Sequence, residues 1–164
     1  MQTAAAKRRF LYLAALSFAL VGCASTTPTP VSVAETIAAT PSLSTLNGLV
    51  AKAGLTDTLK AAGPYTVFAP SDDAFKAVSP KTLDDLARNP EQLKALLTYH
   101  MLPAKLTSAD IRNSSAKTVH GANLALSKAG QYVTVEEAMV QTADIASTNG
   151  VVHLVDRVLM PPRR

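Results

Sequence analysis

The apolar residues of this chain follow helical spacing in its first half and strand spacing in its second half. A helix is predicted within residues 41–54, where apolar residues recur every three or four positions, at Leu43, Leu46, Leu49 and Val50. A shorter helix is predicted at about residues 56–62, because Gly63 and Pro64 break the pattern there. The run YTVFAP, residues 65–70, is short and rich in β-formers, so it predicts a buried strand.

Two further helices begin at recognisable capping sequences. Ser79-Pro80 opens the first, and Asn89-Pro90 opens the second, each with a capping side chain followed by a first-turn proline. Three leucines and His100 share one face of the second helix, at positions i, i+3, i+4 and i+7 counted from Leu93. We therefore expect His100 to point where the leucines point.

From about residue 115 the pattern changes to short strands: AKTV, NLAL, QYVTV, EAMVQTADIA and VVHLVDRVLM. Asn149-Gly150 predicts a two-residue hairpin, since this dipeptide tolerates positive φ. Alternation in the last run predicts that His153 and Arg157 lie on a less buried face than Val152. Helices followed by antiparallel strands indicate an α+β fold in a single domain.

The N-terminus has a different pattern. Lys7, Arg8 and Arg9 precede Phe10–Val21, which carries no charge. A transmembrane helix needs about 20 apolar residues, whereas this run has about a dozen before Gly22, as in cleaved export signals. We therefore expect the segment to be removed.

The sequence Leu-Val-Gly-Cys at residues 20–23 resembles the lipobox of bacterial lipoproteins. This resemblance implies cleavage between Gly22 and Cys23, a diacylglycerol on the thiol of Cys23, and a fatty acyl chain such as palmitate on its new amino group. Two or more chains hold a protein firmly on a membrane. Ala24 resembles the residue found in lipoproteins that are sent to the outer membrane, in organisms that have one.

The predicted organisation has three parts. Residues 1–22 form the signal, residues 23–34 form the lipidated cysteine and a tether rich in Ser, Thr and Pro, and residues 35–162 form the domain. Without the signal, 13 Lys and Arg face 12 Asp and Glu, a net charge of +1. The remaining cations are scattered, which argues against a nucleic-acid partner. The single cysteine excludes an intramolecular disulfide.

Three blocks resemble conserved segments of the fasciclin-like FAS1 family: TVFAPSDDAF at 66–75, LLTYHMLP at 96–103 and STNGVVHLVDRVLMPP at 147–162. The resemblance covers about residues 36–162. It implies a β-sandwich or wedge with helices packed on one side, found outside the cytoplasm, in adhesion and interaction modules that share no catalytic activity. The motif residues that we assign a structural role are Thr66, Phe68, Pro70, Ser71, Asp73, Phe75, Asn149, Gly150, His153 and Asp156.

Two interpretations of Tyr99 and His100 remain open at this point. The resemblance implies a contact site, because this region of some animal FAS1 domains is associated with integrin binding. The helical pattern favours a core role, because a buried histidine left unpaired would cost about 1–3 kcal/mol. On the core interpretation, we expect His100 to bond to the corner formed by residues 71–73.

Other chemistry has little support in the sequence. His100, His120 and His153 lie on separate elements without metal-ligand spacing, so we expect no metal. No G-x-S-x-G elbow, glycine-rich phosphate loop or calcium loop occurs, and Ser71 has a sufficient role as a helix cap. We expect no cofactor and no catalysis.

These observations predict a lipid-anchored, extracytoplasmic binding or adhesion module of the cell envelope, with a monomeric domain and a protein or glycan partner. One alternative is a carrier or structural protein that binds a small apolar ligand between helices and sheet. The other, less favoured, is an envelope enzyme that uses His100 or His153.

Overall fold

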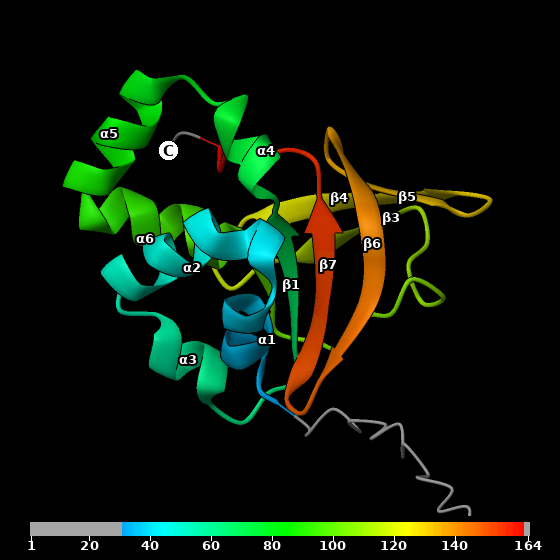
Figure 1. Ribbon diagram of the computed structural model, residues 1–164. Coiled ribbons are helices and arrows are strands. Elements are labelled where there is room, and N and C mark those ends of the chain that lie inside the picture. Colours follow the sequence, from blue (N-terminus) through cyan, green and yellow to red (C-terminus); the bar gives the residue numbers. More distant parts are fainter. Residues whose placement is uncertain (1–30, 163–164) are drawn as a thin grey trace, which may run out of the picture.

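The computed structural model describes residues 31–162 (Figure 1). The helices are α1 (Val33–Ala39), the 3-10 turn η1 (Pro41–Leu43), α2 (Ser44–Lys52), α3 (Thr56–Lys60), α4 (Asp72–Lys76), α5 (Pro80–Arg88) and α6 (Pro90–Tyr99). The strands are β1 (Tyr65–Pro70), β2 (Met101–Leu102), β3 (Ser114–Lys117), β4 (Asn123–Ala129), β5 (Tyr132–Val135), β6 (Ala138–Ser147) and β7 (Gly150–Val155). Within residues 31–162 no helix is long and apolar enough to cross a membrane.

The predicted signal, its cleavage position and Cys23 lie outside the described residues. The tether was predicted to extend to Ala34, but α1 already begins at Val33, which is fully buried. Ser32 starts this helix with a capping box: its hydroxyl accepts from the backbone N–H of Glu35, whose carboxylate accepts from the backbone N–H of Ser32. The folded domain therefore begins a few residues earlier than the composition suggested.

The strands form one sheet in the order β2-β1-β7-β6-β5-β4-β3. Its neighbouring strands are antiparallel except β1 and β7, which run parallel, with Tyr65 opposite Gly150 and Pro70 opposite Val155. The α+β class with helices packed on one side is confirmed, but the sheet is mixed rather than wholly antiparallel. Parallel strands need a long connection, and here residues 71–149, which contain α4–α6 and β2–β6, lie between the two strands.

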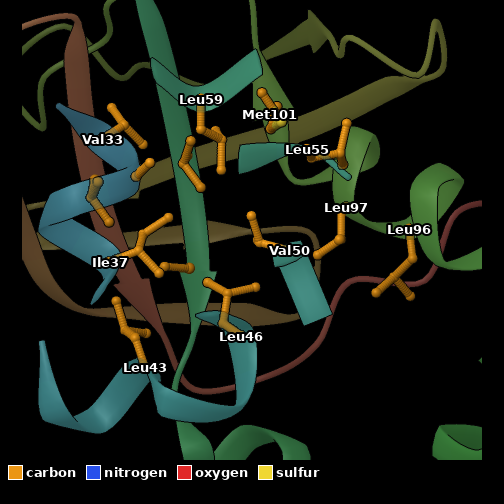
Figure 2. Close-up of a cluster of buried hydrophobic side chains, with 14 of the residues drawn as sticks. Val33, Ile37, Leu43, Leu46, Val50, Leu55, Leu59, Leu96, Leu97 and Met101 are labelled. Carbon is orange, nitrogen blue, oxygen red and sulfur yellow. The ribbon is translucent and has the colours of Figure 1, made fainter. Parts of the chain in front are cut away.

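The central strands β1 and β7 separate two hydrophobic cores, so both of their faces are buried. Val67, Ala69 and Val152 face the helix-side core, while Phe68 and Val155 face a second core formed with β4, β5 and β6. Ile37, Leu46 and Leu97, from three helices, gather in the helix-side core (Figure 2). This placement explains why YTVFAP is nearly continuously apolar, as strands buried on both faces are.

The predicted helix starts and stops are largely confirmed. The hydroxyls of Ser71 and Ser79 cap α4 and α5 by accepting from the backbone N–H groups of Ala74 and Thr82. Gly54, with φ of +66°, follows the end of α2. Asn89 stands at the cap position of α6, but its side chain makes no capping hydrogen bond there. The proline that follows it is sufficient to fix the first turn.

The β6–β7 turn differs from the prediction in one respect. Ser147 pairs with Gly150, so the two turn residues are Thr148 and Asn149, and Gly150 is the first residue of β7 without positive φ. A Cβ at position 150 would lie 2.1 Å from the carbonyl oxygen of Tyr65. Glycine is therefore required here by the close approach of β1 rather than by turn geometry.

Candidate functional site

Tyr99 and His100 lie at the end of α6, between the two cores. Their exposed fractions are 4% and 2%, so neither side chain is available at the surface. The expected placement of His100 on the leucine face is confirmed, because Leu93, Leu96 and Leu97 are buried on the same side. In this conformation the Tyr99-His100 pair is part of the packing and is not a contact surface.

His100 joins the end of α6 to the C-terminal segment. Its Nδ1–H donates to the carbonyl of Leu96 at 2.8 Å, and its Nε2 accepts the backbone N–H of Leu159 at 3.0 Å. The predicted bond to the corner at residues 71–73 is therefore wrong, since the backbone of Leu159 takes that place. Burial lowers the pKa of His100 to about 4 and outweighs the bond to Leu96, so the ring is neutral at pH 7.

Tyr99 directs its hydroxyl toward the β4–β5 hairpin. The hydroxyl lies 3.2 Å from the carbonyl of Asn123 and 3.3 Å from Oε1 of Glu136, which also accepts from the backbone N–H of Ala125 at 2.9 Å. Burial raises the pKa of Tyr99, and the Glu136 carboxylate raises it further. Tyr99 thus stays protonated and serves as a fixed donor.

His153 occupies the middle of β7 and is fully buried, so the prediction of a less buried face is wrong for His153, whereas Arg157, beyond the end of β7, is exposed as predicted. The second core covers the face of β7 that alternation assigned to the outside, and the ring of His153 stacks on Phe68 with centroids 5.5 Å apart. Nδ1 accepts the backbone N–H of Asp144 at 3.2 Å, and Nε2–H donates to the carbonyl of Leu106 at 2.9 Å. Burial lowers the pKa of His153.

Asp144 forms the only arrangement near His153 that resembles catalytic chemistry among the described residues. It sits at a register shift of β6 with φ of 60°, and its carboxylate accepts from both the backbone N–H and the hydroxyl of Ser108. Although burial raises its pKa, the bonds from Ser108 lower it more. His153 meets only the backbone of Asp144, so Ser108 has no histidine base beside it.

The first motif block forms a corner that needs no ligand. Thr66 is buried, where its hydroxyl donates to the carbonyl of Ala104 at 2.6 Å and accepts the backbone N–H of Leu106 at 2.8 Å. Pro70 ends β1, and the Phe75 side chain packs into the helix-side core. Asp73 is exposed in the first turn of α4 and pairs with Lys76 at 2.7 Å.

Asn149 fastens the N-terminal helix to the turn between β6 and β7. Its Oδ1 accepts the backbone N–H of Val33 at 2.8 Å, and its Nδ2 donates to the carbonyls of Leu59 and Ala61. At the other end of β7, Asp156 accepts the backbone N–H of Met139 at 2.7 Å. Sequence analysis identified both residues as motif positions, but not these partners, because the bonds join distant segments.

A large hollow among the described residues lies between α5, α6 and the C-terminal segment. Its volume is about 900 Å³, and Leu86, Ala95, Leu96 and residues 160–162 supply its apolar lining. In Figure 1, α4, α5 and the C-terminal end lie at one end of the molecule, whereas the chain enters beside the β6–β7 turn at the other. This groove could not be predicted from the sequence, because helical spacing does not determine the distance between two helices.

The described residues contain no group of three or more His, Cys, Asp or Glu side chains placed to hold a metal ion. Both buried histidines use their two ring nitrogens in backbone hydrogen bonds. Within residues 31–162, the polar groups of the three motif blocks therefore mainly form hydrogen bonds that stabilise the fold.

Comparison with known proteins gives a consistent result. The model of the Fasciclin domain family matches residues 41–161. Protein sll1483 of Synechocystis sp. is 36% identical over 138 residues, 83% of this chain and 77% of that protein, and protein sll1735 of the same organism is 40% identical over 118 residues, 71% and 88%. A solved FAS1 domain pair from the insect cell adhesion molecule Fasciclin I, 24% identical, superposes with a TM-score of 0.60 over 72% of this chain and 45% of that chain, a likeness of fold.

Proposed function

The chain belongs to the Fasciclin domain (FAS1) family, and we propose that it works as a lipid-anchored module that binds a partner at the cell surface or in the envelope, without catalysis. The family occurs in adhesion and extracellular proteins. The observation that carries the proposal is that Tyr99, His100 and His153, the motif side chains best suited to chemistry, are buried and bonded within the fold. Recognition then falls to the outer surface.

The proposed anchor is the lipid on Cys23, reached through a short tether. Only residues 24–31 separate that cysteine from Ser32, which caps the first helix. Extended chain spans about 3 Å per residue, so this segment places the domain roughly 25 Å from the lipid at most. In an organism with two membranes, Ala24 favours the outer one. Many copies on one membrane raise the effective concentration at a facing surface, which suits weak contacts by single domains.

Surface attachment tests the proposal. Cells that carry the wild-type chain should attach or aggregate more than cells that lack the gene, and Cys23→Ala should lower attachment to the level of the deletion. Mass spectrometry of the membrane-extracted protein should find an N-terminal peptide that begins at Cys23 and carries acyl chains. An intact leader with a free thiol would refute the anchor, and unchanged attachment in the deletion strain would refute the adhesive role.

The alternative of a carrier is less well supported. The space between the helices and β1 has a volume of only about 10 Å³, about enough for one water. A ligand found by mass spectrometry in the purified protein would reopen this alternative. The enzyme alternative requires a free base, and a hydrolase screen with and without His100→Gln or His153→Gln tests it directly.

A further inference from the structure

The groove between α5, α6 and the C-terminal segment is the surface feature best suited to a partner. Its volume of about 900 Å³ lies at the upper end of the range for ligand-binding sites. Met160 lines it and is 48% exposed, one of four large apolar side chains that the described residues leave in water. Pro161 and Pro162 continue the same wall.

The polar groups of the groove are few, and one of them is charged. Thr82, Gln92 and His120 line it together with Asp85, while no lysine or arginine does so among residues 31–162. The ion pairs within these residues, Lys76 with Asp73 and Arg157 with Glu137, do not involve Asp85. The groove therefore combines an apolar wall with one negative charge.

His120 adds to this place a buried polar atom that has no partner within residues 31–162. Its Nδ1 is buried without a hydrogen-bond partner among the described residues, and its ring stands edge-on to Tyr99, with centroids 6.1 Å apart. Buried polar atoms without partners are rare in folded proteins. Because His120 also lines the groove, a hydrogen bond with a bound partner would satisfy this nitrogen.

These features select among ligand classes. A fatty acid or a phosphate would bring a negative charge toward Asp85, which is unfavourable. A glycan would find no Trp, Tyr or Phe among the described lining residues on which to stack. A polypeptide segment with aliphatic side chains and one cation can pack against the apolar wall and pair with the carboxylate of Asp85.

We propose that this groove binds an apolar polypeptide segment with one cation, in which one Lys or Arg pairs with Asp85 while neighbouring aliphatic side chains pack against Met160 and Pro161. The inference rests on the proposed function and narrows its partner from protein or glycan to protein. The groove is lined by α5 and the C-terminal segment, which lie at one end of the molecule, whereas the chain enters beside the β6–β7 turn at the other (Figure 1). An anchored domain therefore leaves the groove open to a facing surface.

Peptide binding tests the inference on the full-length chain in phosphatidylcholine nanodiscs, with empty nanodiscs as the blank. The probes are fluorescein-labelled octapeptides with one Lys among Leu and Val, and the same peptides with Gln in place of Lys. In fluorescence anisotropy the Lys peptides should bind about fivefold more tightly than the Gln peptides, as expected for one exposed ion pair. High salt should remove this preference.

Three variants make the test specific. Asp85→Asn should abolish the preference for Lys, and Met160→Lys should weaken binding of the Lys peptides, whereas Asp84→Asn, at the neighbouring exposed position outside the lining, should leave binding unchanged. Equal binding of the Lys and Gln peptides, equal effects of Asp84→Asn and Asp85→Asn, or binding to a glycan array or to anionic vesicles alone would overturn the inference. Peptide binding found only in a chain that ends at Pro162 would make residues 163–164 the occupant and would also overturn it.

Failure of this inference is distinguishable from failure of the proposed function. If Cys23→Ala abolishes attachment while Asp85→Asn retains it, the adhesive role stands and the groove is not its site. If Cys23→Ala retains attachment, the proposed function fails whatever the peptides do.

Discussion

His100 and His153 show how single residues of the motif blocks serve the fold. Each ring is neutral and bridges two backbone groups, with the proton on Nδ1 in His100 and on Nε2 in His153. The unprotonated nitrogen of each ring accepts a hydrogen bond from a backbone N–H. A second proton on that nitrogen would point at the same N–H and break the bond. The neutral state is therefore part of the folded structure.

Acidification should destabilise the domain. The unfolded state binds protons at a histidine pKa of about 6.5, whereas His100 has a pKa of about 4 when folded, so its contribution is complete above pH 6.5 and declines as the pH falls toward 4. His100 alone accounts for about 3 kcal/mol, and His153, whose pKa is also lowered, adds in the same direction. Urea unfolding between pH 7 and pH 4.5 measures most of this loss, together with a contribution from carboxylates that begin to titrate near the lower limit.

His100→Gln provides the control for this pH dependence. The variant should be less stable than the wild type at pH 7, because the hydrogen bonds of the ring to the backbone of Leu96 and Leu159 are lost. Its stability should nevertheless change less between pH 7 and pH 4.5. An unaltered slope would mean that other groups cause the acid sensitivity.

Gly150 should tolerate no side chain. In Gly150→Ala the new Cβ would meet the backbone of Tyr65 at 2.1 Å, which requires β1 or β7 to move, so we expect a loss of about 2 kcal/mol or more. Gly48→Ala is the matched control, since Gly48 lies inside α2 with nothing within 4 Å of the added Cβ. That change should stabilise the protein by about 0.5–1 kcal/mol. Equal thermal shifts in the two variants would contradict the packing at β1.

At the scale of elements, features that depend on neighbouring residues were predicted well, whereas pairings between distant segments were not predicted. Helix caps at Ser71 and Ser79 and the succession of short strands from about residue 115 follow from neighbouring residues, and the structure has both. The parallel pairing of β1 with β7, the two-residue strand β2 and the burial of His153 depend on contacts between segments that are distant in the sequence. Helix α1 was not predicted, because residues 31–34, VSVA, were assigned to the tether.

Helix α1 should depend on its cap. Ser32→Ala removes the hydroxyl that accepts from Glu35, and the domain should lose about 1 kcal/mol, as for other N-caps. Since α1 also meets Asn149 through the N–H of Val33, hydrogen exchange should accelerate at Val33 and in the β6–β7 turn together. Faster exchange in α1 alone would indicate that the two segments are not coupled.

At the scale of the whole molecule, the N-terminal segment enters the domain at one end, and the groove lies toward the other end. The tether joins α1 beside the β6–β7 turn, and the backbone N–H of Thr148 donates to the carbonyl of Val31 at 2.9 Å, so pulling on the tether would load the central strand β7 directly. This arrangement suits a domain that is anchored at one end and makes contact at the other. The family was predicted from the sequence and is confirmed, and the anchor stays a prediction. The groove could not be predicted, because its width depends on how α5 is placed relative to α6.

Attachment of cells with exchanged anchors tests the central claim most directly. Wild-type cells, cells with Cys23→Ala, and cells in which residues 1–23 are replaced by a single transmembrane helix followed by the same tether are compared under flow. The account predicts that Cys23→Ala releases the protein and abolishes attachment, and that the transmembrane helix restores it. Full attachment by Cys23→Ala cells, or none with the restored anchor although the domain is folded and present, would contradict it.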